Sequence, residues 1–496
     1  MAVRDAMRSR LPLLTLANTC VLCLASLACG NSASPPVTVP TVPTVPTVPP
    51  AATGNDWTRF GWDAARSNAS TAPTGITALN VSSLVRQQVT IDGTVDGSAI
   101  YLHGVQVNGV KHDAFFVTTT YGKTLAIDAS DGTILWRYTP SGYDSWAGSY
   151  QITTATPVAD PGRAFVYAAS PDGRIQKLAV LDGHSIWSTA ITKLPAREKI
   201  AAALNFFNGR VIATTGGYVG DAGPYQGHVA ILDAASGQLL SVWNTLCSDQ
   251  SGLLDPASCP ESDSAIWGRG GAVIDSTTGN IFVTTGNALW DGRTYWGDAV
   301  LELDPNGTHL IGNYTPANTS ELNARDQDLG SASPALLGTV VAQGGKDGVI
   351  RLLDWTVLGG ATPHLGGERQ TVSTPSGREL VTAPAVWRSG TTTWLFAGDN
   401  GDTAAWTLSA GSLQPVWKSG HGGTSPVVAG GLLFVYDPSN GGLHVYQPDT
   451  GQELATLDCG GGHWNSPIVI DGRVALPEGS ANDRRTTGLL NIWRVP

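Results

Sequence analysis

The stretch TLAIDASDGTILWRY at 124–138 decides the fold of this chain. Apolar residues alternate through TLAID and again through ILWRY, which is typical of half-buried β-strands. The ASDGT segment between them holds the Asp and Gly residues that favour a tight hairpin turn. The stretch therefore predicts a β-hairpin whose second strand carries Trp136.

The same hairpin pattern returns seven more times along the chain. Its further copies are KLAVLDGHSIWST from Lys177, HVAILDAASGQLLSVW from His228, AVLELDPNGTHLIGNY from Ala299, IRLLDWTVLGG from Ile350, AAWTLSAGSLQPVW from Ala404, LHVYQPDTGQELATL from Leu443 and LLNIWRV from Leu489. Eight copies of one strand–turn–strand unit indicate a repeat architecture, which a count of domains from chain length alone would miss.

A second marker, a strand that begins with small residues, precedes each hairpin. Its eight forms are GSAIYLHG, TATPVADPG, AAALNFFNG, GGAVIDSTTG, SASPALLG, TAPAVWRSG, TSPVVAGG and NSPIVIDG. Two markers in constant alternation, with repeats of roughly 40–70 residues, fit a four-stranded antiparallel blade plus its loops. The sequence predicts an all-β fold, an eight-bladed β-propeller.

The chain ends predict how the ring closes. VSSLVRQQVTI at 81–91 resembles a lone outer strand ahead of the first full repeat, and the last repeat stops at its third strand. A linear solenoid would need capping units, whereas a closed ring does not. We therefore expect the N-terminal strand to complete the last blade by pairing with the C-terminal strand.

The first 54 residues predict export and tethering. Arg4, Arg8 and Arg10 precede a short apolar run that ends in LASLAC, so residues 1–29 are typical of a signal peptide. Cys29 stands where a bacterial lipoprotein carries its lipid, and ordinary cleavage near the same place is the alternative. Residues 30–54 are rich in Pro, Thr and Val and favour an extended tether. The propeller then spans 55–496, in the periplasm or at the cell surface, with a membrane attachment only through the lipid.

Charge and cysteine content limit the partners. The formal net charge of −11 and the lack of a basic run argue against nucleic-acid binding. Cys247 and Cys259 flank one loop, CSDQSGLLDPASC, and a local disulfide there suits an oxidising compartment. The state of Cys459 is left open, and no C-x-x-C-H motif for haem attachment is present.

The repeat resembles a known family. AIDASDGTILW at 126–136 is similar to the pyrroloquinoline-quinone (PQQ) repeat pattern A-x-D-x-x-(T/S)-G-x-x-x-W, AVLDGHSIW at 179–187 to a shortened form, and DWTRFGWDAARSNAS to the family's opening segment. The resemblance to this quinoprotein alcohol dehydrogenase-like family covers nearly all of 55–496. It implies that the recurring tryptophans, Trp136, Trp187, Trp243 and Trp417, pack between blades.

Residues 265–354 resemble the polyvinyl-alcohol-dehydrogenase-like branch most closely. By that match, Trp267 in AIWGRGGAVID would be the floor on which the quinone stacks. Asp328 in RDQDLGSASPAL would be the catalytic base, and Lys346 in GGKDGVIRLLD would pair with the quinone oxygens. The structural alternatives are a loop cap for Asp328 and an exposed turn residue for Lys346.

The resemblance also implies a Ca²⁺ site. Asn287 in TTGN would be a ligand, and Asp326 a second acidic group near the metal. Asp221 in GGYVGDAG is the nearest candidate for the Glu ligand of the family, although it is out of register. A turn role for Asn287 and a capping role for Asp326 are the alternatives. The vicinal disulfide of many members is absent.

Two functions therefore stay open. One is a PQQ- and Ca²⁺-dependent oxidoreductase that takes a small alcohol and passes electrons to a separate acceptor. The other is a cofactor-free scaffold that binds envelope proteins, since the same propeller serves in outer-membrane assembly. Fold does not decide between them.

Overall fold

The structure is a computed structural model that describes residues 55–355, 358, 360 and 362–496. The predicted signal peptide, the tether and Cys29 lie outside the described residues and stay predictions. Among the described residues, no helix has the length and apolarity needed to cross a bilayer.

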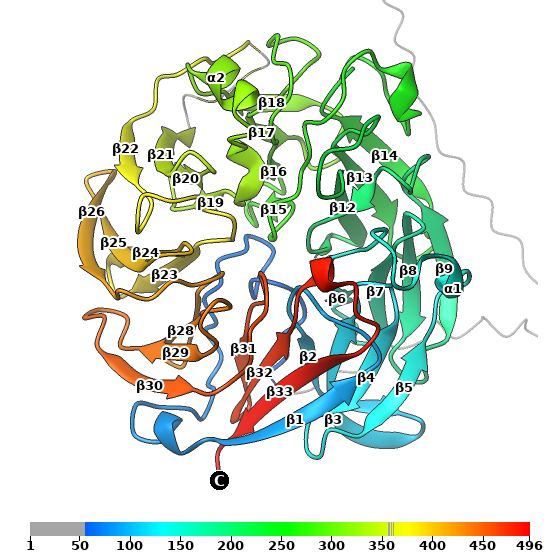
Figure 1. Ribbon diagram of the computed structural model, residues 1–496, viewed down its shortest axis with the longest axis vertical. Helices are drawn as coiled ribbons and strands as arrows, with labels where there is room; N and C mark the ends of the chain where they lie inside the picture. Colours follow the sequence, from blue (N-terminus) through cyan, green and yellow to red (C-terminus); the bar gives the residue numbers. More distant parts are fainter. Residues whose placement is uncertain (1–54, 356–357, 359, 361) are drawn as a thin grey trace, which may run out of the picture. The chain divides into compact units, whose positions relative to one another are not determined.

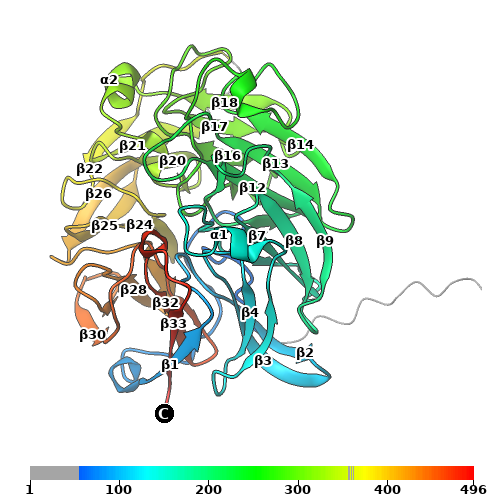
Figure 2. The ribbon, with the colours of Figure 1, turned by 45° about the vertical axis from the view of Figure 1, so that its right-hand side comes forward.

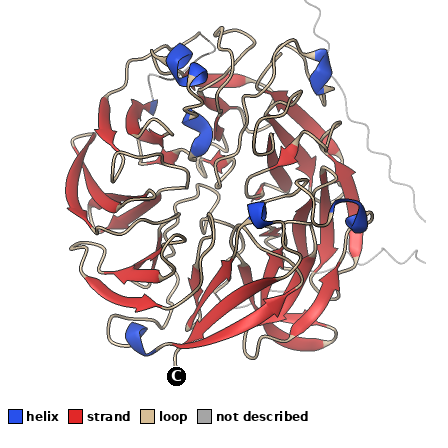
Figure 3. Cartoon of the chain, viewed as in Figure 1, coloured by secondary structure: helices blue, strands red, loops and turns tan. Residues whose placement is uncertain are grey.

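Eight antiparallel sheets follow one another along the described chain, as the two markers predict (Figure 1). In the part of the chain that the structure describes, helices occur only as short turns in the loops (Figure 3). These are α1 (Tyr143–Trp146), α2 (Thr319–Ala324) and the 3-10 turns η1 (Val81–Ser83), η2 (Pro256–Ser258), η3 (Leu329–Ser331) and η5 (Ala481–Asp483). The prediction of an all-β, eight-bladed propeller is confirmed.

The first four blades contain the following strands. Blade 1 has β2 (Ile100–Val107), β3 (Val110–Thr118), β4 (Thr124–Asp128) and β5 (Ile134–Tyr138), and blade 2 has β6 (Val158–Ala159), β7 (Phe165–Ser170), β8 (Arg174–Ala179) and β9 (Ser185–Ala190). Blade 3 has β10 (Lys199–Ile200), β11 (Asn205–Phe207), β12 (Arg210–Gly216), β13 (His228–Asp233) and β14 (Leu239–Asn244), and blade 4 has β15 (Val273–Ile274), β16 (Ile281–Thr284), β17 (Val300–Leu303) and β18 (Leu310–Tyr314).

The other four blades repeat the pattern. Blade 5 has β19 (Ala335–Leu336), β20 (Val340–Gly344), β21 (Val349–Asp354) and β22 (Gln370–Ser373), and blade 6 has β23 (Ala385–Ser389), β24 (Thr392–Gly398), β25 (Thr403–Ser409) and β26 (Ser412–Lys418). Blade 7 has β27 (Val427–Ala429), β28 (Leu432–Tyr436), β29 (Leu443–Tyr446) and β30 (Glu453–Leu457), and blade 8 has β31 (Ile468–Ile470), β32 (Arg473–Glu478), β33 (Gly488–Arg494) and β1 (Val85–Ile91).

Strand β1 closes the ring. It pairs antiparallel with β33 from Val85 opposite Arg494 to Ile91 opposite Gly488, so blade 8 takes its outermost strand from the other end of the described chain (Figures 1 and 2). Val89 and Ile91 point into the core while Thr90 between them is exposed. This is the closure that the lone strand at 81–91 predicts.

The segment before β1 crosses the ring. Its backbone bonds to blade 1 through Trp57 and Tyr101, to blade 6 through Ser67 and Val386, and to blade 7 through Asn68 and Val428. These three bonds reach residues within the inner strands β2, β23 and β27, and the Asn68 side chain also donates to the Ala383 and Pro384 carbonyls just before β23. The segment therefore runs along the inner strands of the ring.

Arg66 anchors this crossing segment. Its side chain is 3% exposed and donates to the carbonyls of Phe60, Ala203 and Leu204. Burial lowers the pKa of Arg66 to about 9. The Ala203 and Leu204 carbonyls thereby hold the segment against blade 3.

The recurring tryptophans pack between neighbouring blades. A Cβ built on Gly183 would lie 2.6 Å from the Trp136 ring. A Cβ on Gly237 would lie 2.6 Å from the Trp187 ring, and one on Gly451 would lie 2.6 Å from the Trp417 ring. Each tryptophan belongs to one blade, and the glycine belongs to the hairpin turn of the next. Trp243 is buried among residues of blades 3 and 4. The repeat signature is thus a contact between successive repeats.

We expect Gly183→Ala to destabilise the protein more than Gly209→Ala. Both glycines have φ near +75°, at +74° and +73°, so both substitutions cost about 1 kcal/mol of backbone strain. Only Gly183 faces a tryptophan, and overpacking adds about 1–3 kcal/mol there. A Cβ built on Gly209 would meet no other side chain or backbone atom within 4 Å. Thermal unfolding of the two variants measures the difference, and equal destabilisation would contradict the inter-blade contact.

Candidate functional site

One pocket collects most of the predicted site residues. It has a volume of about 260 Å³ and takes its lining from blades 2, 3, 4, 5, 6 and 8, so it lies at the ring axis. Five of the six predicted cofactor and catalytic residues line it: Asp221, Trp267, Asp326, Asp328 and Lys346. We call it the axial pocket. Its lining residues lie in the loops before the inner strands, as Trp267 does, and in the loops after the second strands, as Asp221 and Lys346 do.

Asp328 is the buried carboxylate of the axial pocket. It is 3% exposed and directly precedes η3, ahead of the inner strand of blade 5. Its Oδ1 accepts the backbone N–H of Asn287 at 2.6 Å, and its Oδ2 lies 2.6 Å from Lys346 Nζ. Burial raises the pKa of Asp328, and the Lys346 ammonium opposes that shift without cancelling it. A carboxylate of raised pKa in a pocket has the character of a general base.

Glycine allows the close approach around Asp328. A Cβ on Gly286 would lie 2.8 Å from Asp328 Oδ1 and 3.4 Å from the Trp267 Nε1 atom. The carboxylate and the indole therefore meet over the same backbone position. The backbone of the TTGN motif, at Gly286 and Asn287, thus lies against the Asp328 carboxylate.

Lys346 lies between two carboxylates. Its Nζ is 2.6 Å from Asp328 Oδ2, 3.0 Å from Asp326 Oδ1 and 5.4 Å from the centroid of the Trp267 ring. Burial alone would lower the pKa of Lys346, but Asp328 and then Asp326 outweigh it and raise that pKa. The ammonium is thereby fixed beside both the base and the aromatic surface.

A column of stacked groups forms the aromatic side of the axial pocket. Trp267 stacks on Trp464 with ring centroids 5.5 Å apart, and Trp464 stacks on His463 at 3.9 Å. The Arg269 guanidinium lies 4.8 Å from the Trp464 ring. Asp96, whose side chain is fully buried, holds this column by accepting from Arg269 and from His463.

Lys199 is a further basic side chain of the same pocket. Burial, with the neighbouring Arg269 charge, lowers the pKa of Lys199 to about 7. No hydrogen bond or ion pair of its amine is found among the described residues. Together, Lys199, Arg269 and Lys346 give the pocket three cationic side chains around two indoles.

The residues predicted to hold Ca²⁺ are only partly brought together. Asp326 and Asp221 line the axial pocket, and Asn287 meets Asp328 through its backbone N–H. The Asp221 carboxylate accepts the Tyr225 hydroxyl at 2.7 Å. Within the described chain, the carboxylates of Asp221, Asp326 and Asp328 do not form a group whose ligand atoms all lie within 4.8 Å of one another. Lys346 Nζ instead bridges Asp326 and Asp328.

Comparisons with known proteins find similar repeats and a similar fold. Residues 62–255 match the family profile described as outer membrane protein assembly factor BamB, PQQ_2. The chain is 27% identical over 285 residues to quinohemoprotein alcohol dehydrogenase ADH IIB of Pseudomonas putida, and 24% identical over 291 residues to a polyvinylalcohol dehydrogenase of a Pseudomonas species. The repeats of this chain are thus similar to those of the PQQ_2 family and of quinoprotein alcohol dehydrogenases.

The relatives are longer than the region that they share with this chain. The two alignments cover 51% and 55% of this chain but only 40% and 42% of the relatives. The solved structure of quinohemoprotein alcohol dehydrogenase ADHIIG from Pseudomonas putida superposes with a TM-score of 0.65 at 14% identity, covering 89% of this chain and 80% of that one. At that identity, the superposition shows the shared fold.

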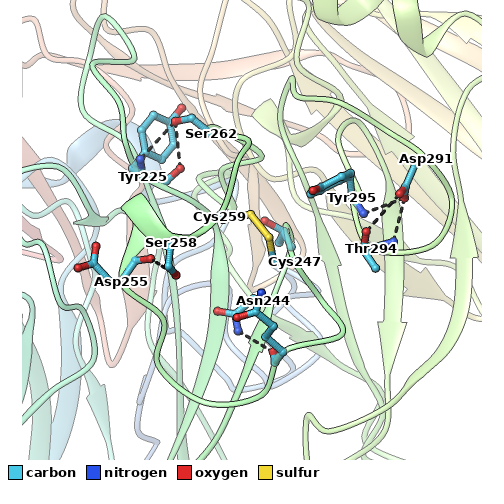
Figure 4. Close-up of a disulfide and its surroundings, with 12 residues drawn as sticks. Tyr225, Asn244, Cys247, Asp255, Ser258, Cys259, Ser262, Asp291, Thr294 and Tyr295 are labelled. Carbon is cyan, nitrogen blue, oxygen red and sulfur yellow. Dashed lines mark hydrogen bonds between the residues drawn. A yellow bond between two sulfur atoms is a disulfide. The ribbon is translucent and has the colours of Figure 1, made fainter.

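A disulfide joins Cys247 and Cys259 in this propeller (Figure 4). It closes the loop between β14 and β15, which also carries Ser262. Ser262 accepts the Tyr225 backbone N–H (Figure 4), and the Tyr225 hydroxyl donates to Asp221. The loop thereby supports one wall of the axial pocket. Cys459 is free and buried.

Our sequence analysis missed Lys199, Arg269 and Trp464. Each stands one or two residues before a copy of the second marker, namely AAALNF, GGAVI and NSPIVI. Inner strands of a propeller start near the axis, so the residues just before them surround the pocket. That position in the repeat was the signal that could have identified all three.

Proposed function

We propose that this chain is an exported, PQQ-dependent oxidoreductase that oxidises an alcohol in the axial pocket. The observation that supports it most is the convergence of Trp267, Asp328 and Lys346 from two blades on one pocket. Two of its relatives are named quinohemoprotein alcohol dehydrogenase and alcohol dehydrogenase (quinone). The electrons would leave to a separate acceptor.

The pocket's chemistry suits a flat, multiply charged anion such as PQQ. Lys199 and Arg269 offer cationic donors: the Lys199 amine has no partner among the described residues, and the buried Arg269 Nε also has none. Trp267 offers an aromatic surface, with the Lys346 ammonium close to its face. When bound, the quinone supplies the two-electron acceptor that the protein itself lacks.

The side chains would divide the work on the alcohol. Asp328, as a carboxylate, takes the proton of the substrate hydroxyl, for which burial and its raised pKa suit it. Lys346 holds Asp328 in place and keeps a positive charge where negative charge develops. Asp96 fixes Arg269 and His463, and through them Trp464.

The residues of the pocket fit Ca²⁺ only in part. The pocket has one buried carboxylate, Asp328, and both of its oxygens already have protein partners. Ca²⁺ binds six to eight oxygen ligands, so Asn287, Asp326 and Asp221 would have to turn toward Asp328 to complete a site. We therefore assign no step to the metal.

The test is binding of PQQ to the purified chain, with and without CaCl₂. We expect a shift of the quinone absorbance at about one equivalent of PQQ, followed by alcohol-dependent reduction of an acceptor dye. Lys199→Met should weaken PQQ binding. Lys193→Met should not, because Lys193 is an exposed lysine outside the pocket. Failure to bind PQQ under both conditions would end the proposal.

Activity should depend on pH through Asp328. Because the base must be ionised and its pKa is raised, kcat/KM should rise with pH through a pKa above that of a free aspartate. Lys346→Met removes the strongest influence that lowers this pKa, so the acid limb should move to higher pH, while Lys346→Arg should move it less. Rate profiles of the PQQ-loaded variants measure the shift, and an unmoved limb in Lys346→Met would contradict the assignment.

A second candidate is a cofactor-free scaffold for envelope proteins. The match of residues 62–255 to the BamB profile favours it, as does the absence of a grouped set of carboxylates in the described part of the pocket. If the chain is a scaffold of this kind, Asp328→Ala should have no effect in cells. Co-purification with envelope proteins, without PQQ binding, would select this candidate.

We also propose export and tethering. The signal-peptide pattern of residues 1–29 and the Pro-rich stretch at 30–54 support it. Cys29 would carry the lipid. Mass spectrometry of the mature N-terminus in a bacterial host tests this, since Cys29→Ala should abolish lipid attachment.

A further inference from the structure

Three potential metal ligands meet on blade 7, outside the axial pocket. His421 lies in the loop between β26 and β27, His444 in β29 and Glu453 in β30. β30 is the outermost strand of the blade (Figure 1). None of the three lines the axial pocket. They are 23 and 9 residues apart in sequence, which is no recognised metal-binding spacing, so only folding of the blade gathers them.

The distances among the three suit one metal ion. One ligand atom from each side chain lies within 4.8 Å of the others. His444 Nδ1 is 2.8 Å from Glu453 Oε1, and His421 Nε2 is 3.9 Å from Glu453 Oε2. Ligands of a tetrahedral zinc ion with bonds of about 2.0–2.1 Å lie about 3.3 Å from one another, between those two values. Small side-chain rotations therefore suffice for binding.

Neighbouring groups hold two of the ligands in place. The Thr456 hydroxyl donates to Glu453 Oε1 and lies 3.4 Å from His444 Nδ1. His444 also stacks on His421, with ring centroids 4.5 Å apart. Contacts of this kind orient metal ligands and strengthen binding.

One side of the cluster faces solvent. The side chain of His444 is 9% exposed, whereas those of Glu453 and His421 are 35% and 46% exposed. Three protein ligands with an accessible fourth position are typical of sites that keep a bound water. Imidazole nitrogens favour Zn²⁺, Cu²⁺ and Ni²⁺ over Ca²⁺ and Mg²⁺.

We propose that His421, His444 and Glu453 bind one divalent transition-metal cation of the Zn²⁺ type. The site is independent of the proposed oxidoreductase function and of its cofactor. By bridging the loop at His421 to strands β29 and β30, the ion would fix the connection between blades 6 and 7.

The experiment is a calorimetric titration of the purified full chain with Zn²⁺. The chain must carry no polyhistidine tag. We expect one equivalent to bind, and Co²⁺ in its place should give the visible absorption of tetrahedral coordination. His421→Ala and Glu453→Gln should each weaken Zn²⁺ binding by roughly tenfold or more. Both residues are substantially exposed, and Glu453→Gln keeps an acceptor for Thr456.

His309→Ala is the matched control, because His309 is also exposed and lies 3.9 Å from a carboxylate, that of Asp304. It should leave Zn²⁺ binding unchanged, as should Asp328→Asn in the axial pocket. Absence of binding would overturn the proposal. So would equal weakening by His309→Ala, since the ion would then lie on scattered surface histidines.

Discussion

Asp328→Asn is expected to lower kcat/KM for alcohol oxidation by about 10²–10⁴-fold in the PQQ-loaded chain, because it removes a general base. The amide is nearly the same size and can still accept the backbone N–H of Asn287, so the pocket should keep its shape. Quinone binding should persist. Dye-linked assays and PQQ titrations on the same preparation separate the two effects.

Asp326→Asn is the matched control for this substitution. Asp326 also contacts Lys346 Nζ, at 3.0 Å, but its side chain is 62% exposed and it has no contact with Trp267 among those described. We expect a change of less than about fivefold, since an exposed ion pair contributes little. If the two variants lose activity equally, Asp328 does not act as the sole base, and a role for both carboxylates at a metal would be the better interpretation.

The fold could be predicted because the repeat has two periodic markers. The hairpin at 124–138 and its seven copies fix strands and turns locally, and the small-residue strands fix the start of each blade. Closure followed from a strand without a partner at 81–91. All of these signals are short-range patterns, which the sequence carries directly.

The crossing segment could not be predicted in the same way. Residues 55–76 have almost no regular structure, and what places them is a set of single contacts such as those of Trp57 and Arg66 with distant blades. Each of these contacts joins residues far apart in the chain. No local periodicity in the sequence predicts contacts of this kind.

The site residues also fall into two groups, those that a local sequence motif marks and those that it does not. Trp267, Asp328 and Lys346 could be chosen because a family motif marks them, and the fold brings them to one pocket. Lys199 and Trp464 carry no such motif, and only their place before an inner strand gives them a common location. Asn287 was selected for its side chain, yet the contact seen is that of its backbone N–H with Asp328.

Ring closure leads to the second large effect, which we expect for Ile91→Asp. Ile91 is 1% exposed in β1 and belongs to the core that blade 8 shares with blades 1 and 7. The substitution removes its apolar contacts and buries a carboxylate among apolar side chains, which should cost more than about 4 kcal/mol. Since β1 pairs with β33 and no other strand, its loss exposes the edge of β33 and opens the ring between blades 8 and 1.

Thr90→Asp is the control, because Thr90 is the neighbouring residue of β1 and its side chain points to solvent. It should change stability by no more than about 0.5 kcal/mol. Thermal unfolding by circular dichroism compares the pair, and limited proteolysis should cut Ile91→Asp, but not Thr90→Asp, near β1 and β33. Equal stability of the two variants would mean that the ring does not depend on this strand, because the same added charge on either face of β1 would then be tolerated.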